Sequence, residues 1–116
     1  MAKKEDHVLS EEELAKALEE LPGWEVRENW LYHRYKTPGW AHTMMLAQTI
    51  GHLADAAFHH PDLHLGYANV SVRLQTHRVL AITYSDVELA KKIDEVVTWL
   101  PSEESPLEGF PKNWVR

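Results

Sequence analysis

With 116 residues, of which 44% are hydrophobic and 26% charged, the sequence has the size and composition of one globular domain. Its formal net charge is −6 and its basic residues are scattered, which argues against nucleic acid as a partner, because a phosphate backbone requires clustered lysine and arginine. It contains no cysteine, which excludes disulfides and thiol nucleophiles, and no run approaching the roughly 20 apolar residues that span a bilayer. We therefore expect a cytoplasmic protein without a membrane partner.

The first predicted elements are a helix and a short hairpin. Ser10 followed by Glu13 forms a capping-box pattern, in which each side chain accepts a backbone N–H of the other residue at a helix start. Residues 24–36 alternate with a period near two and carry aromatic side chains, as paired strands do. We place the turn between these two strands at Glu28 and Asn29.

A long helix is expected over residues 39–59, which contain no proline and are rich in Ala, Met and Leu. Its apolar residues form two stripes, one of Trp40, Met44, Ala47, Gly51, Ala54 and Phe58 and the other of Leu46, Ile50, Leu53 and Ala57. A helix that is apolar on two sides is buried on two sides, and one sheet covers only one of them. We therefore expect another subunit on this helix, with Ala47, Gly51 and Ala54 permitting close approach.

The second half of the sequence predicts another hairpin and a closing helix. Residues 70–75 alternate between apolar and polar side chains, and a second strand is predicted over 79–84, after a tight turn at 76–78. Ser85 and Glu88 form a second capping-box pattern, which predicts the start of the last helix.

The expected element order is α-β-β-α-β-β-α, without a signal for a parallel crossover. This order predicts an α+β fold, in which helices pack on one face of a four-stranded antiparallel sheet. The domain is expected over residues 10–100, between an N-terminal extension, 1–9, and a C-terminal tail, 101–116. Phe110 and Trp114 in the tail indicate that it docks on the domain.

Histidines are the most conspicuous candidates for chemistry. Pro61 ends any arriving helix near His59 and allows His59 and His60 to adopt different backbone conformations, so that their rings can converge on one pocket. His77 lies at the predicted turn, where a histidine has no packing purpose. An imidazole with a pKa of about 6.5 is suited to giving and taking protons at neutral pH. Proton transfer is therefore the expected chemistry, with Asp55 one helical turn before His59 to orient its ring.

A metal site is an alternative interpretation of the histidines. His60 and His64 do not fit the zincin pattern, because they straddle a proline and lack the adjacent glutamate. His52, Asp55 and His59 would share a helix face, so a site built on them stays open, although we expect no metal and no other cofactor. Surface or capping positions are expected for His7, His33, His42 and His64.

Several of these residues together resemble the pterin-4a-carbinolamine dehydratases. The run "DAAFHHP" at 55–61 carries an acidic residue followed by His-His-Pro, and a third histidine and an aspartate follow at the intervals of that family. The positions that fit the pattern are Asp55, His59, His60, Pro61, His77 and Asp86. The similarity covers about residues 10–99 and includes Gly23 and Trp24.

The resemblance implies a cofactor-free dehydratase that acts on a small-molecule pterin, 4a-hydroxytetrahydrobiopterin. Loss of water yields quinonoid dihydropterin and allows tetrahydrobiopterin recycling after an aromatic amino acid hydroxylase, the expected pathway partner. By the family pattern His59 and His77 handle the two protons and His60 assists in binding the pterin edge. The family fold is also a four-stranded antiparallel sheet with helices on one side, commonly assembled as a homodimer or homotetramer.

The same resemblance implies roles for three further residues. Asp55 would orient His59 in the substrate site, Trp24 would form a wall against the flat ring, and Asp86 would either contact substrate or cap the last helix. Many members carry a glutamate at the position of Asp55 and a polar residue at that of Phe58. A non-catalytic binding module of the same fold, acting as a dimerisation cofactor or an assembly chaperone, is the alternative function. Retention of the three histidines favours the enzyme.

Overall fold

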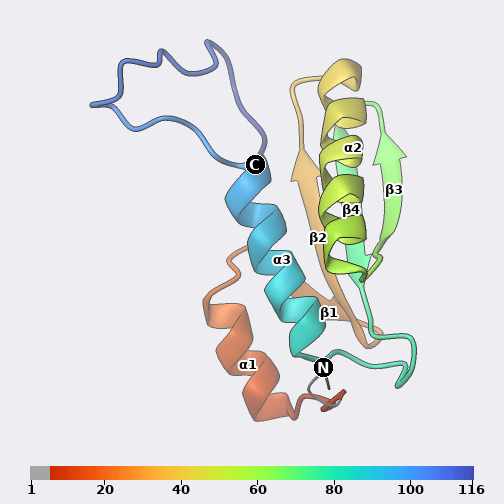
Figure 1. Cartoon of the computed structure of the whole chain (residues 1–116). Coiled ribbons are helices and arrows are strands. Elements are labelled where there is room, and N and C mark those ends of the chain that lie inside the picture. The colour runs from red at the N-terminus through yellow and green to blue at the C-terminus, as the bar shows by residue number, and fades with distance from the viewer. Residues whose placement is uncertain (1–5) are drawn as a thin grey trace.

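The computed structural model describes residues 6–116 (Figure 1). The order α-β-β-α-β-β-α and the antiparallel α+β fold are confirmed. The elements are α1 (Glu11–Glu19), β1 (Glu25–Arg27), β2 (Trp30–Lys36), α2 (Trp40–Ala57), β3 (Asp62–Gly66), β4 (Asn69–Leu74) and α3 (Tyr84–Val97). No helix in this part of the chain is both long and apolar enough to cross a membrane.

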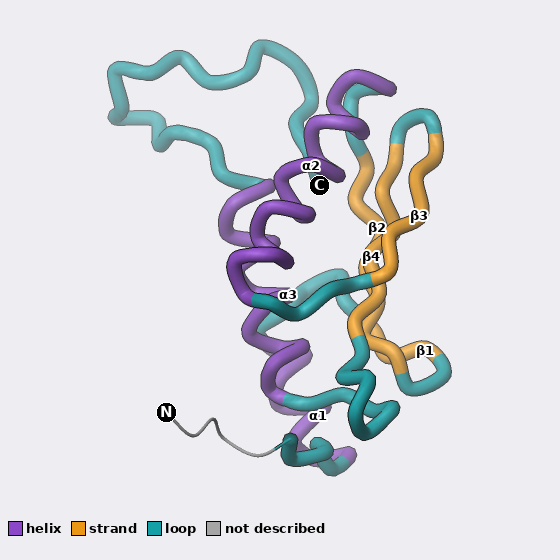
Figure 2. Tube along the Cα trace, turned by 45° about the vertical axis from the view of Figure 1, so that its right-hand side comes forward, coloured by secondary structure: helices purple, strands orange, loops and turns teal. Residues whose placement is uncertain are grey.

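The sheet and the helices form two layers. The strands are ordered β1-β2-β4-β3 and every neighbouring pair is antiparallel. All three helices lie on one side of this sheet (Figure 2). Val70, Val72 and Leu74 of β4 are fully buried between the layers, where Ile50 of α2 and Ile93 of α3 pack against the sheet. The alternation predicted for residues 70–75 therefore selects the core face of the central strand.

The first hairpin forms as predicted. Tyr32 pairs with Glu25 and Trp30 with Arg27, so the chain reverses across Glu28 and Asn29. Both turn residues have positive φ, 46° for Glu28 and 70° for Asn29. That combination matches a type I′ turn, whose twist suits the right-handed twist of paired strands.

The second hairpin differs from the prediction. β4 pairs with β3 (Asp62–Gly66), which precedes it, and not with residues 79–84. The segment 79–84 forms no strand; one isolated bridge joins Thr76 to Ala81. Leu80 has a φ of 50°, which interrupts an extended backbone, and Thr83 is already the N-cap of α3. The strand count was right, but the partner of β4 was wrong.

The capping pattern predicted for α1 is confirmed, and the one predicted for α3 is wrong. Ser10 and Glu13 form a complete capping box. For α3 the box is formed by Thr83 and Asp86, two residues earlier than expected. Because Thr83 is 2% exposed and Asp86 fully buried, this helix start is anchored in the core, whereas Ser85 is exposed to solvent.

Helix α2 carries apolar residues on two sides, as expected, but Ala54, one of the three small residues expected to meet another subunit, is 2% exposed and packs in the core of the same chain. Leu46 and Ile50 face the sheet and are buried, while Trp40 and Met45 on the outer side are 50% and 57% exposed. The tail covers a small part of the outer side: the rings of Phe110 and Trp114 each lie 5.0 Å from that of His42. Val115 is buried, and the Arg116 and Lys36 backbones exchange two hydrogen bonds. Docking of the tail is thus confirmed.

Candidate active site

The end of α2 determines where the paired histidines point. Phe58 follows the helix in the left-handed conformation, with a φ of 51°. The His59 backbone N–H donates to the Ala54 carbonyl at 3.0 Å, the hydrogen bond that closes a Schellman motif. Pro61 then prevents the helix from continuing. The two histidines therefore leave the helix in different directions, as their sequence predicts.

His59 is held against a buried carboxylate. Its Nε2 donates to Asp86 Oδ1 at 2.6 Å, and 19% of its side chain is exposed, compared with none of Asp86. The second carboxylate oxygen of Asp86 accepts from Thr76 Oγ1 at 2.8 Å and from the Thr83 backbone N–H at 2.9 Å. Three donors thus satisfy the hydrogen-bonding capacity that burial would otherwise leave unmet. Asp86 therefore caps α3 and fixes the His59 ring.

His60 is paired with a different carboxylate. Its Nε2 donates to Asp55 Oδ1 at 2.8 Å, and the side chains are 50% and 83% exposed. The expectation that Asp55 orients His59 is therefore wrong. The left-handed turn at Phe58 directs His59 toward α3 and leaves His60 within reach of the last turn of α2.

The three histidines line one small pocket. His77 lies in the loop that returns from β4 to α3 near the end of α2 (Figure 1). The pocket has a volume of about 150 Å³ and is lined by Phe58, His59, His60, Gln75, Thr76, His77 and Arg78. We call it the histidine pocket. It unites the three predicted catalytic residues and adds three polar neighbours that the sequence analysis did not assign to the site, Gln75, Thr76 and Arg78, although all three lie within two residues of His77.

Comparison with known proteins identifies the family. The sequence model of the pterin 4 alpha carbinolamine dehydratase family matches residues 7–96. This chain belongs to that family. The match includes every histidine of the histidine pocket and both of their carboxylate partners.

Two related proteins are similar to this chain over most of their own length. A protein of Aquifex aeolicus is 43% identical over 89 residues, which cover 77% of this chain and 90% of the relative. A protein of Sulfurisphaera tokodaii is 37% identical over 95 residues, covering 78% and 97%. Both are provisionally named pterin-4-alpha-carbinolamine dehydratases.

Solved structures share the fold. A Brucella melitensis protein described as a transcriptional coactivator/pterin dehydratase has a TM-score of 0.72 at 26% identity, covering 76% of this chain and 96% of that one. A pterin dehydratase-like RuBisCO assembly factor of the alpha-carboxysome has a TM-score of 0.51 at 17% identity, covering 61% and 82%. The second likeness concerns the fold alone.

Trp24, which was expected to form a wall of the substrate site, does not line the histidine pocket. The indole is 5% exposed, and its Nε1 donates to Asp94 Oδ2 at 3.1 Å. It stacks on His33 and meets Tyr35 edge to face, filling the space between β2 and α3. The Tyr35 hydroxyl donates to the same carboxylate, and burial together with this bond raises the pKa of Tyr35 well above its usual value. This cluster packs the core.

The residues of the alternative metal site do not converge. His59 lies beyond the end of α2, so it does not continue the helix face of His52 and Asp55. His59 is bound to Asp86, and Asp55 is bound to His60. Within residues 6–116 no group of three or more histidine, aspartate or glutamate side chains is arranged to hold a metal ion.

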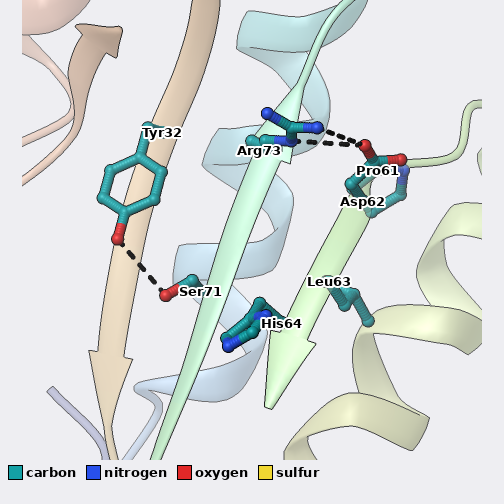
Figure 3. A pocket seen from close by; sticks show the side chains of 7 residues that line it. All are labelled: Tyr32, Pro61, Asp62, Leu63, His64, Ser71 and Arg73. Carbon is teal, nitrogen blue, oxygen red and sulfur yellow. Dashed lines mark hydrogen bonds and ion pairs between the residues drawn. The ribbon is translucent and has the colours of Figure 1, made fainter. Parts of the chain in front are cut away.

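A larger hollow lies on the uncovered face of the sheet (Figure 3). Its volume is about 690 Å³, and the side chains that line it come from β2, β3 and β4 and from Pro61, which precedes β3. Its polar groups are largely paired with one another: Tyr32 with Ser71 at 3.2 Å and Arg73 with Asp62 at 3.0 Å. It holds a single histidine, His64, so it lacks the paired acid and base of the histidine pocket.

Proposed function

We propose that this protein dehydrates 4a-hydroxytetrahydrobiopterin to quinonoid dihydropterin by acid–base catalysis in the histidine pocket. The proposal rests on one observation. Three histidines line the same pocket, and one of them, His59, is held by the buried Asp86 carboxylate. Membership of the dehydratase family supports the same reaction. The proposed context is tetrahydrobiopterin recycling in the cytoplasm, downstream of an aromatic amino acid hydroxylase.

The reaction requires two proton transfers. The hydroxyl on C4a takes up a proton and leaves as water, the proton on N5 is removed, and a double bond forms between C4a and N5. One proton is added and one is lost, so a pair of imidazoles suffices. The base ends protonated and the acid deprotonated, and proton exchange with water restores both before the next turnover. Such positioned acid and base groups contribute about 10²–10⁴ in rate.

We assign the two protons to His59 and His77. Because His59 Nε2 donates to Asp86, its Nδ1 is the nitrogen free to accept the N5 proton. The carboxylate then stabilises the imidazolium that forms. His77, which is exposed on the other element of the pocket, protonates the departing hydroxyl. His60, tied to Asp55, contributes to binding the edge of the pterin.

Stopped-flow decay of 4a-hydroxytetrahydropterin, with and without the protein, tests the proposal. His59→Ala and His77→Ala should each lower turnover by about 10²–10⁴ while leaving a cooperative unfolding transition. His64→Ala, a histidine of β3 outside the pocket, is the matched control and should retain turnover. Unchanged turnover in both pocket variants contradicts the assignment. Activity should survive a chelator, and a loss restored by zinc would favour the metal interpretation.

We also propose that the outer side of α2 packs against a second copy of the chain, as a homodimer or homotetramer. Trp40, Met44 and Met45 are large apolar side chains that α2 leaves exposed, and extensive apolar surface of this kind is rare on monomeric proteins. A Cβ added at Gly51 would meet nothing within 4 Å, so this position is open to a neighbouring subunit. Gly51→Glu should dissociate the assembly in sedimentation experiments, and a wild type that is monomeric at micromolar concentration contradicts the proposal.

The exposed apolar side chains of α2 also favour a second candidate function, that of a binding module. The Brucella melitensis structure is described as a coactivator as well as a dehydratase. A protein of this kind would present an apolar helix face to its partner whether or not the histidines act. Absence of any catalysed decay in the stopped-flow assay would favour this function over the enzyme.

A further inference from the structure

The histidine pocket contains a permanent positive charge and no carboxylate. Of its lining residues, Arg78 is the only one charged at every pH near neutrality, and none is acidic. Asp86 is buried behind His59, and Asp55 is turned toward His60; neither lines the pocket. Arg78 is therefore the one permanent cation that the lining of the pocket offers to an anionic ligand, although the whole chain carries a formal net charge of −6.

Arg78 is held by an acidic residue of the segment before α1. Its Nε donates to Asp6 Oδ2 at 2.5 Å and its terminal nitrogen to Oδ1 at 3.0 Å, a two-point contact of the kind that guanidinium also makes with other oxyanions. The Arg78 side chain is 77% exposed and that of Asp6 is 20% exposed. The hydrogen bond lowers the pKa of Asp6, so that the carboxylate is ionised at neutral pH.

The arginine side of this ion pair lies largely in water, so replacing its counterion costs little free energy. Exposed ion pairs contribute little to stability, because water solvates both partners when they separate. A ligand anion that enters the pocket can therefore replace Asp6 on the same guanidinium without unfolding any element. The side chain of tetrahydrobiopterin is uncharged, so it cannot replace the Asp6 carboxylate as the counterion of this arginine.

The rim of the pocket supplies a surface for a flat ring. The Phe58 side chain is 85% exposed, and its ring lies edge to face with His60 at 5.5 Å between centroids. Gln75 and Thr76 add polar groups among the lining residues. The pocket thus combines an aromatic rim, proton-transfer groups and one cation with an exchangeable counterion.

We infer that the pocket also takes, and binds more tightly, pterins whose side chain ends in an anionic group such as a phosphate or a carboxylate, and that Arg78 exchanges Asp6 for that group. The inference rests on the proposed function, because the ring is identified as a pterin by the dehydratase proposal. It adds a specificity residue, Arg78, and a competing counterion, Asp6, to the catalytic histidines.

Fluorescence titration of the full chain with two unreactive ligands tests the inference. Neopterin and its monophosphate share ring and carbon skeleton and differ only in the charged ester. The wild type should bind the phosphate several-fold more tightly, about tenfold for a well-formed charge-assisted contact. The ratio of the two dissociation constants should fall toward one in Arg78→Gln and should shrink with added salt.

Two further variants make the result specific. Asp6→Asn removes the competing anion, so the preference for the phosphate should rise about two- to threefold, whereas a purely structural ion pair predicts no rise. Arg34→Gln removes an equal charge from an exposed strand position outside the pocket and should leave the ratio unchanged.

The outcomes separate the two proposals. Equal affinity for both ligands in the wild type, or an unchanged ratio in Arg78→Gln, overturns the inference while pterin binding still supports the dehydratase. A reduced preference in Asp6→Asn also overturns the exchange, because it would make Asp6 necessary for the site. Binding of neither ligand overturns the inference and the proposed function together.

Discussion

The starts of α1 and α3 are built from the same three parts, an N-cap hydroxyl, a carboxylate three residues later and a histidine bound to that carboxylate. At α1 the Glu13 carboxylate accepts from the Ser10 backbone N–H at 2.8 Å and from His7 Nε2 at 2.9 Å. At α3 the Asp86 carboxylate accepts from the Thr83 backbone N–H at 2.9 Å and, on its other oxygen, from His59 at 2.6 Å.

Burial is what separates the two arrangements. The side chains of His7 and Glu13 are 58% and 34% exposed, whereas those of His59 and Asp86 are 19% and 0% exposed. Exposed ion pairs are screened by water, while a buried carboxylate must be satisfied by its neighbours or it destabilises the fold. The same local motif therefore serves as an ordinary cap at α1 and as a fixed support for a proton-transfer group at α3.

The largest effect is expected when the carboxylate charge of Asp86 is removed, in comparison with that of Glu13. Asp86→Asn keeps the size of the side chain, but an amide has only one oxygen to accept from the three donors that surround Asp86. We therefore expect turnover to fall by about 100-fold and the free energy of unfolding by about 3 kcal/mol. Glu13→Gln is the matched control, with turnover within about twofold of wild type and a small loss of stability. Stopped-flow assays and urea titrations measure both. Similar losses in the two variants would show that burial does not distinguish the pairs.

An intermediate effect is expected from the N-cap hydroxyls. Thr83 Oγ1 lies 2.7 Å from Thr76 Oγ1 in the core, and Ser10 is exposed. Thr83→Ala should lower the free energy of unfolding by about 2 kcal/mol and Ser10→Ala by about 1 kcal/mol, because caps range over these values with burial. Urea midpoints compare them, and Thr83→Ser should restore most of the loss. A larger loss in Ser10→Ala would reverse the comparison.

The fold was predictable wherever a local pattern decides the structure. The capping box at Ser10 and the turn at Glu28 and Asn29 depend on neighbouring residues only, and both form. The strand β3 was missed although Leu63 and Leu65 alternate with polar neighbours, because the apolar run over 79–84 offered a second partner for β4. The choice between these partners depends on how the loop reaches α3, which is a tertiary property.

The proximity of the three histidines was predictable from the sequence, but their carboxylate partners and the position of Trp24 were not. The His-His-Pro run and the family resemblance indicated His59, His60 and His77, and all three line the pocket. Asp55 was expected to bind His59 and binds His60 instead, because Phe58 adopts a left-handed conformation. That conformation costs a non-glycine residue roughly 1–2 kcal/mol and is not expected of phenylalanine. No pattern in the sequence predicts this left-handed turn, although the turn determines which histidine contacts Asp86.

The smallest effect concerns acid and follows from the exposed cap at α1. Hydrogen bonds from the Ser10 backbone N–H and from His7 lower the pKa of Glu13 from its usual value of 4.5 to about 2. A carboxyl whose folded pKa is lowered stabilises the folded state above its unfolded pKa, and that contribution is lost as the pH falls through the folded value. The window for Glu13 therefore lies between about 4.5 and 2.

Comparison of wild type and Glu13→Gln in urea across that window isolates this contribution. The wild type should be slightly more stable at about pH 6, and the difference should vanish as the pH approaches 2, because a protonated Glu13 no longer accepts both donors as an anion. The change should be small, since the carboxylate is partly exposed and water competes for it. A stability difference that stays constant from pH 6 to pH 2 would mean that the cap acts through its shape alone, and the two helix starts would then differ in kind as well as in burial.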